Sequence, residues 1–129
     1  MNPETYRTDL GQEITAHRAY MGLSQRGMAR RLDVERRNYQ RIEQGRDACP
    51  PGFLDKVNVL VDQFDAAVDS ILDYAAKQDD RTVNIEIQSA GCWEWERNVA
   101  YRAHVVSAWQ DNPVTVVLTL VDDAEQEAS

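Results

Sequence analysis

The chain has 129 residues, of which 43% are hydrophobic and 28% are charged, and its formal net charge is −8. This size fits one medium domain or two small ones, and the composition is typical of a globular protein with a buried core. No apolar run in the sequence approaches the roughly 20 residues that span a bilayer, and residues 1–10 show no signal-peptide pattern, so we expect none. We therefore expect a cytoplasmic protein without a membrane partner.

Positive charge is concentrated in one segment of this acidic chain. Residues 1–46 carry a net charge of +3, whereas residues 47–129 carry −11. Residues 22–46 alone hold seven of the fourteen basic residues. Such an asymmetry predicts that the basic segment binds a polyanion. The acidic segment has two open interpretations, which are solubility and the repulsion of DNA from the wrong face of the protein.

Cysteine and histidine, which are common in catalytic and metal sites, are few in this chain. Cys49 and Cys92 are far apart in the sequence, and together with His17 and His104 they match no metal-ligand spacing. We interpret both cysteines as free thiols in a reducing compartment. The sequence has no nucleophile elbow, glycine-rich phosphate loop or zinc-protease motif. We therefore expect no catalytic site, metal, cofactor or small-molecule ligand.

The first 45 residues predict three short helices. Asp9 is a candidate N-cap for the first helix, which ends at Gly22, and Ser24 is a candidate N-cap for the second. Apolar residues recur at helical spacing in the second helix. The third helix covers about residues 35–44 and ends at Gly45, because glycine suits the left-handed conformation that follows a helix.

A longer helix follows a loop that contains two prolines. Pro50 cannot donate a backbone hydrogen bond, and Pro51 is the predicted start of the next helix. Apolar residues then recur every three or four positions and form a continuous seam, at Leu54, Val57, Val61, Phe64, Val68, Ile71 and Ala75. This seam must be covered by the rest of the chain or by a second copy of it.

The pattern changes to strands after residue 78. Apolar residues alternate with other residues in 82–88 and in 114–121, and each segment predicts one strand. Residues 98–109 allow a helix between them, which the Asp-Asn-Pro sequence at 111–113 would stop. A small β-α-β or hairpin-based unit results.

These elements together predict a mainly α protein with a small α+β C-terminal unit. Two domains are expected. Residues 1–78 hold the three short helices and the long helix, and residues 79–129 form a small strand-containing domain that we expect to dimerise.

The third predicted helix carries long polar side chains on one face. Its Arg and Gln residues fall within an arc of about 140° on a helical wheel, while Tyr39 and Ile42 point the other way. In the DNA major groove, Arg pairs with guanine and Gln with adenine, and each good pair contributes about 1–3 kcal/mol of discrimination. The candidate base-reading residues are Arg36, Arg37, Gln40, Arg41 and Gln44.

A second set of residues is suited to contact the DNA backbone. Gln25 lies at the N-terminus of the second predicted helix, where backbone amides attract phosphate. Basic side chains near it would position the protein on DNA without reading bases. The candidate phosphate-binding residues are Gln25, Arg26, Arg30 and Arg46.

This segment resembles the Cro/cI-type (XRE) helix-turn-helix family. That family's pattern is an Arg in the first helix, then G-L-S-Q, an Ala inside the second helix, a tight turn and a closing I-E-x-G. The matching residues are Arg18, Leu23, Ser24, Gln25, Ala29, Leu32, Val34, Ile42, Glu43 and Gly45. The resemblance implies a lambda-repressor-like bundle that binds double-stranded DNA as a repressor, in which Arg18 and Glu43 pair as a structural brace.

Two positions depart from the pattern of that family. The Gly of the turn is Asp33, which can adopt a positive φ at a modest cost. The small residue that usually precedes the recognition helix is Glu35, which leaves the start of that helix open. The resemblance covers residues 18–45 and therefore concerns only the basic segment of the chain.

The order of the elements resembles a second group, the two-domain anti-CRISPR-associated (Aca) regulators of phages. The shared features are R-x-A-x-P at residues 46–50, a long helix, and W-x-D-N-P at residues 109–113. This resemblance implies a homodimer, formed through the C-terminal unit, that represses its own operon. Dimers of this type place two recognition helices roughly 34 Å apart in successive major grooves, so we expect an operator with an inverted repeat.

Other interpretations of the same residues stay open from the sequence. The acidic half fits a protein-interaction module such as an antitoxin or a phage-encoded inhibitor, and the basic helix fits RNA or a solvated surface. Trp93 and Trp95 are interpreted as core or interface residues, because the neighbouring Glu94 and Glu96 would repel a nucleic-acid backbone.

Overall fold

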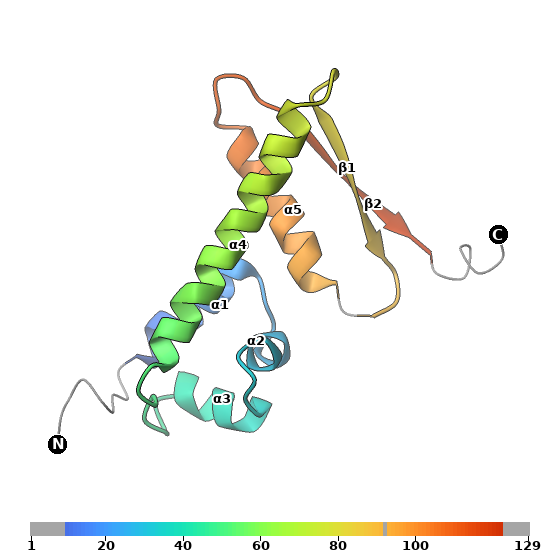
Figure 1. The fold of residues 1–129 in the computed structure, drawn as a ribbon. Coiled ribbons are helices and arrows are strands. Elements are labelled where there is room, and N and C mark those ends of the chain that lie inside the picture. The colour runs from blue at the N-terminus through green and yellow to red at the C-terminus, as the bar shows by residue number, and fades with distance from the viewer. Residues whose placement is uncertain (1–9, 92, 123–129) are drawn as a thin grey trace. The chain divides into compact units, whose positions relative to one another are not determined.

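The structure, a computed structural model, describes residues 10–91 and 93–122 and divides into two compact units, residues 1–63 and 64–129. The first unit contains three short helices and the beginning of a long one, which are α1 (Gly11–Met21), α2 (Gln25–Arg31), α3 (Arg36–Glu43) and α4 (Phe53–Ala76) (Figure 1). The second unit contains the rest of α4 and the elements β1 (Thr82–Gln88), α5 (Glu94–Ser107) and β2 (Thr115–Val121). The expected fold class is confirmed. The division between the two units falls inside α4, and the domain boundary after residue 78 stays a prediction.

Each of the three short helices ends at a residue in the left-handed conformation. These residues are Gly22, Asp33 and Gly45, with φ of 69°, 58° and 75°. At the end of α2 the amide of Val34 donates to the carbonyl of Ala29 at 3.0 Å, which is the hydrogen bond of a Schellman motif. The positive φ expected of Asp33 is confirmed, and it produces the tight turn between α2 and α3.

The helix starts follow local capping chemistry in one case and depart from it in another. The Ser24 hydroxyl accepts a hydrogen bond from the amide of Gly27 at 2.9 Å, as expected of an N-cap. Glu35 precedes α3 in an extended conformation, and its side chain makes no capping hydrogen bond. The helix therefore starts at Arg36. The candidate cap Asp9 lies outside the described residues.

The long helix α4 begins later than the sequence pattern predicted. Pro51 was the expected first residue, but Gly52 has a φ of +81° and the helix starts after it, at Phe53. Within α4, Leu60 and Leu72 are buried, whereas the neighbouring Val61 and Ile71 of the predicted seam are half-buried. A repeat of 3.6 residues rotates the buried stripe by one position over several turns, which a strict 3–4 alternation does not capture.

The apolar core of the first unit is supplied by every one of its helices. The buried residues recur three or four positions apart in α3, at Tyr39 and Ile42, and in α4, at Phe53, Val57 and Leu60. The buried apolar residues are Ile14, Met21, Leu23, Met28, Ala29, Leu32, Tyr39, Ile42, Cys49, Phe53, Val57 and Leu60. None of the helices in the described ranges is both long and apolar enough to cross a membrane.

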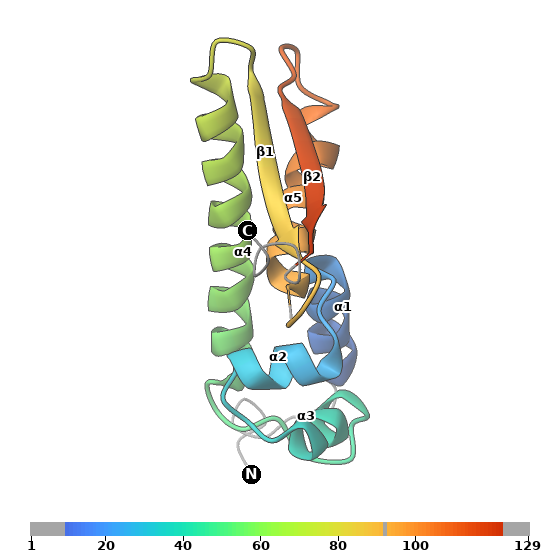
Figure 2. The same cartoon turned by 90° about the vertical axis from the view of Figure 1, so that its right-hand side faces the viewer.

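The second unit is a β-α-β arrangement, and of the two alternatives the hairpin is wrong. β1 and β2 are parallel, with Thr82 opposite Thr115 and Gln88 opposite Val121. The crossover between them is α5, which lies along one face of the two strands (Figure 2). α5 starts at Glu94, four residues before the segment in which the sequence allowed a helix.

The core of the second unit lies between α4, α5 and the strands. The ring of Trp95 meets the ring of Phe64 edge to face, with centroids 5.3 Å apart. The packing role expected of Trp95 is thereby confirmed. Besides Phe64, the buried apolar residues of this unit are Val68, Leu72, Ala75, Val83, Ile87, Val99, Ala100, Ala103 and Val116.

Candidate nucleic-acid interface

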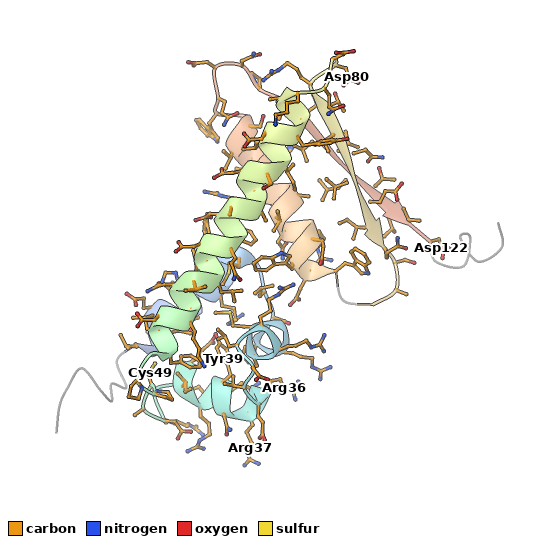
Figure 3. The ribbon with its side chains drawn as sticks, viewed as in Figure 1. Arg36, Arg37, Tyr39, Cys49, Asp80 and Asp122 are labelled. Atoms are coloured by element: carbon orange, nitrogen blue, oxygen red, sulfur yellow. The ribbon has the colours of Figure 1, made fainter. Side chains whose placement is uncertain are left out.

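Helix α3 has one buried face and one exposed polar face. Tyr39 is fully buried and Ile42 is 7% exposed, so these two side chains anchor the helix. Arg36 and Arg37 are exposed, and Figure 3 shows Arg37 on the side of α3 that lies away from Tyr39. The exposed face therefore offers guanidinium groups on a helix whose opposite face is buried in the core.

The carboxylate of Glu43, on the buried side of α3, is the centre of a hydrogen-bonded network. Arg18 in α1 donates to it through Nε at 2.7 Å and through Nη2 at 3.2 Å. Gln25 in α2 donates at 3.1 Å, and the hydroxyl of Tyr39 donates as well. Arg18 also donates to the carbonyl of Leu23 at 3.0 Å. The network joins all three short helices through one buried carboxylate.

The electrostatics of this network favour the ionised form of Glu43. Burial raises the pKa of the Glu43 carboxyl, but the hydrogen bonds from Arg18, Tyr39 and Gln25 outweigh it, so its pKa lies below the ordinary value. Burial, together with the hydrogen bond to Glu43, raises the pKa of the Tyr39 phenol. The hydrogen bond to Glu43 also raises the pKa of Arg18. All three groups therefore keep one protonation state near neutral pH.

A second link connects α2 to the polar face of α3. The amide nitrogen of Gln40 donates to the side-chain oxygen of Gln25 at 2.9 Å, while Gln25 donates to Glu43. A carboxamide has two N–H groups and one oxygen, so Gln40 keeps one donor and one acceptor for another partner. Such a donor and acceptor pair is what recognition of adenine requires.

Arg41 is not an unengaged side chain on this face. Its Nε donates to a carboxylate oxygen of Asp47 at 3.0 Å, and both side chains are about two-fifths exposed. The hydrogen bond with Asp47 raises the pKa of Arg41. An exposed ion pair of this kind is weak, because water screens it. A nucleic-acid partner would have to compete with Asp47 for Arg41.

The predicted phosphate-binding residues fall into two groups. Arg26, Arg30 and Arg46 are exposed. Gln25 is half-buried and is already hydrogen-bonded to Gln40 and Glu43. Of the predicted base-reading residues, Arg36, Arg37 and Gln44 are exposed, while Gln40 and Arg41 are half-buried and hydrogen-bonded.

Three features of this surface were missed from the sequence. The spacing of Tyr39 and Glu43, four positions apart on one helix, was the available signal for their hydrogen bond. No comparable signal linked Gln25 to Gln40, because the two residues lie on different helices. The sequence pattern predicts only a loop at Asp47, and the ion pair of Asp47 with Arg41 depends on how the chain turns after Gly45.

Residues 9–62 match the protein family described as a helix-turn-helix domain. No curated protein matches the chain. The chain therefore contains a helix-turn-helix domain in this segment. The narrower XRE and Aca assignments stay predictions.

Proposed function

We propose that this protein is a sequence-specific transcriptional repressor that binds double-stranded DNA through α3. Arg36, Arg37 and Gln44 contact base edges directly, and Gln40 and Arg41 join them when the duplex is bound. The candidate phosphate-binding residues Gln25, Arg26, Arg30 and Arg46 set the position of the protein on the DNA backbone.

The observation that carries this proposal is the combination of an exposed Arg face with a rigid support behind it. Glu43 is 7% exposed and is held by groups from α1, α2 and α3. A helix fixed in this way loses little conformational freedom when it enters a groove, and pre-organisation of this kind favours binding. The match of residues 9–62 to helix-turn-helix domains supports the same function.

The proposal extends to assembly and to the regulated gene. A single recognition helix buries little surface, so two copies on an inverted repeat supply the affinity that a specific operator needs. The protein therefore acts as a homodimer on the promoter of its own operon. The layout shared with Aca regulators suggests that this is a phage anti-CRISPR operon.

Selection of bound duplexes from a random pool tests the function. The parent protein is expected to enrich an inverted repeat. Arg37→Ala is expected to relax the preference at one position of each half-site, whereas Arg26→Ala weakens binding to all duplexes and flattens the salt dependence. Lys77→Ala, which removes an exposed basic side chain just after α4 and away from β2, is the control and is expected to leave selection unchanged.

A footprint on the DNA upstream of the gene tests whether the protein regulates its own promoter. Protection of a palindrome there supports autoregulation. If the parent protein enriches no duplex at all, the proposal is wrong and a protein-interaction module such as an antitoxin becomes the better account of the chain.

A further inference from the structure

The strand β2 exposes apolar side chains on both of its faces. Leu118 and Leu120, on one face, are 37% and 71% exposed, and Val117, on the other, is 42% exposed. Residues 114–121 contain no charged residue. A strand that is apolar on both faces is typical of the interior of a parallel sheet and not of its edge. In the described ranges, however, β1 is the strand that pairs with β2, so one edge of β2 is open (Figure 2).

The hydrogen bonds with β1 define which backbone groups lie on that open edge. The backbone amide of Thr115 donates to the carbonyl of Arg81, and the carbonyl of Val121 accepts from the backbone amide of Ser89. In a parallel ladder, every second residue directs both of its groups to the same neighbour. The backbone N–H and C=O groups therefore point toward β1 at residues 115, 117, 119 and 121. They point away from β1 at Val116, Leu118 and Leu120.

Val114, two residues before Val116, does not belong to this open edge. The backbone N–H and C=O of Val114 are both bonded to the hydroxyl of Ser107, at 2.8 Å and 3.0 Å. The open edge within β2 thus consists of Val116, Leu118 and Leu120. An edge of this composition is a template for another strand.

We propose that β2 pairs antiparallel with β2 of a second copy of this chain, with Leu118 opposite Leu118 on the two-fold axis. Val116 then lies opposite Leu120 of the partner. Three N–H and three C=O groups from each chain form six hydrogen bonds, and the two sheets become one of four strands in the order β1-β2-β2-β1. Within the bounds of β2, an axis at Val117 or at Thr119 would pair only two of the three residues.

A second copy fits this edge better than a strand of another protein for two reasons. Because residues 114–121 carry no charge, an isologous pair of these strands places no like-charged residues opposite each other, although the unit to which β2 belongs is acidic. The symmetric register also leaves no backbone group of the open edge unpaired. A two-stranded sheet is marginal alone, whereas four strands covered by two copies of α5 give a sheet of ordinary size. This inference names the surface of the homodimer on which the proposed repressor function rests.

Sedimentation of the full-length protein without DNA tests the pairing. The parent chain is expected to be a dimer at micromolar concentration. Leu118→Lys places two ammonium groups on the axis and is expected to weaken the dimer at least 100-fold, because residues opposite each other in such a pair are about 5.5 Å apart at Cα. Val117→Lys is the matched control: it is equally exposed, but it faces Thr119 of the partner, and it is expected to weaken the dimer less than tenfold.

Disulfide formation tests the register and does not depend on the lysine variant folding. Leu118→Cys is expected to form an intermolecular disulfide on mild oxidation, since the expected Cα separation lies within the disulfide range. Thr119→Cys, which has no cysteine opposite it in this register, is expected to form far less. The parent chain, with Cys49 and Cys92, controls for its own thiols.

Three results would overturn the pairing: a monomeric parent, an intact dimer of a folded Leu118→Lys variant, or a dimeric Leu118→Cys variant that crosslinks no better than Thr119→Cys. The failure of the proposed DNA function would look different. A parent protein that dimerises through Leu118 but enriches no duplex would retain the strand pairing and refute the repressor.

Discussion

In the first unit, the buried polar groups beneath α3 are paired with one another, whereas in the second unit backbone and apolar groups of β2 are left open. Glu43 is 7% exposed and has donors from three helices. Leu120 is an apolar residue with 71% of its surface exposed. In the first unit, the outer face of α3 offers a partner exposed guanidinium groups, while the second unit offers the edge of a sheet. Electrostatic steering suits the recognition of DNA, and apolar and backbone groups suit permanent assembly.

The largest effect is expected from Glu43→Ala, which tests whether the stability of the first unit depends on the hydrogen bonds around Glu43. Glu43→Ala leaves the Arg18 guanidinium and the Tyr39 hydroxyl without their partner, and we expect a loss of about 3–5 kcal/mol in the free energy of unfolding. Urea denaturation followed by circular dichroism measures it. Glu35→Ala, which removes an exposed carboxylate that caps nothing, is the control. A loss below about 1 kcal/mol in the Glu43 variant would mean that the network contributes little.

A smaller loss is expected where α1 approaches the end of α3. A Cβ at Gly11 would lie 2.8 Å from the carbonyl oxygen of Ile42 and still closer to that of Glu43, and backbone cannot move aside as a flexible side chain can. We expect Gly11→Ala to destabilise the protein by about 1–3 kcal/mol, the usual cost of overpacking. Gln12→Ala, at an exposed neighbouring position, is expected to be neutral. A Gly11→Ala variant as stable as the parent would mean that the two helices are not in close contact.

The corresponding test of the second unit concerns assembly and not folding. Leu120→Ala removes an exposed side chain, so the monomer should be as stable as before, but the dissociation constant of the dimer is expected to rise about tenfold because the leucine is covered by the partner. Trp109→Ala, which removes an 87% exposed side chain outside β2, is the control. Equal weakening by both variants would mean that general apolar exposure, and not the edge of β2, holds the dimer together.

Lowering the pH tests whether the charge of Glu43 contributes to stability. Its pKa is lowered on folding, so the stability that its charge contributes is fully present above about pH 4.5 and is lost as the pH falls through the lower pKa of the folded state. The difference in unfolding free energy between the parent and Glu43→Gln should therefore be constant from pH 7 to about 5 and shrink below that range. A difference that grows on acidification would contradict the lowered pKa.

The smallest expected effect concerns the ion pair between Arg41 and Asp47. Asp47→Asn releases Arg41 from an exposed pair, so we expect an unchanged thermal midpoint and a modestly higher affinity for the selected duplex. Asp33→Asn removes the same charge from the same unit and leaves Arg41 paired. If both variants gain affinity equally, the gain comes from net charge and Arg41 does not read a base.

Much of the helix-turn-helix segment was predictable because its signals are local. Ser24, Asp33 and Gly45 act on the backbone within a few residues, through a side-chain cap in the first case and a positive φ in the other two. The helical wheel of α3 likewise separated Tyr39 and Ile42 from the Arg face. The start of α4 was misplaced by two residues because the sequence does not distinguish a proline that begins a helix from one that precedes a left-handed glycine.

The candidate site was less predictable than the elements that carry it. The residues of the exposed face follow from the periodicity of one helix, but the link between Gln25 and Gln40 and the ion pair of Arg41 with Asp47 join different segments. Side-chain pairing across such separations depends on how the segments pack, and several alternative partners lie within reach in the unfolded chain.

By itself, the sequence determined the order and approximate positions of the helices and strands, much of the face that each one buries, and that positive charge is concentrated near α3, since all of these follow from spacing along the chain. Only the tertiary structure decided that β1 and β2 are parallel, that Glu43 joins three helices, and which backbone groups of β2 are open. The physical reason is that strand direction and hydrogen-bond partners are set by packing between segments distant in sequence, and alternating apolar residues fit a hairpin and a β-α-β crossover equally well.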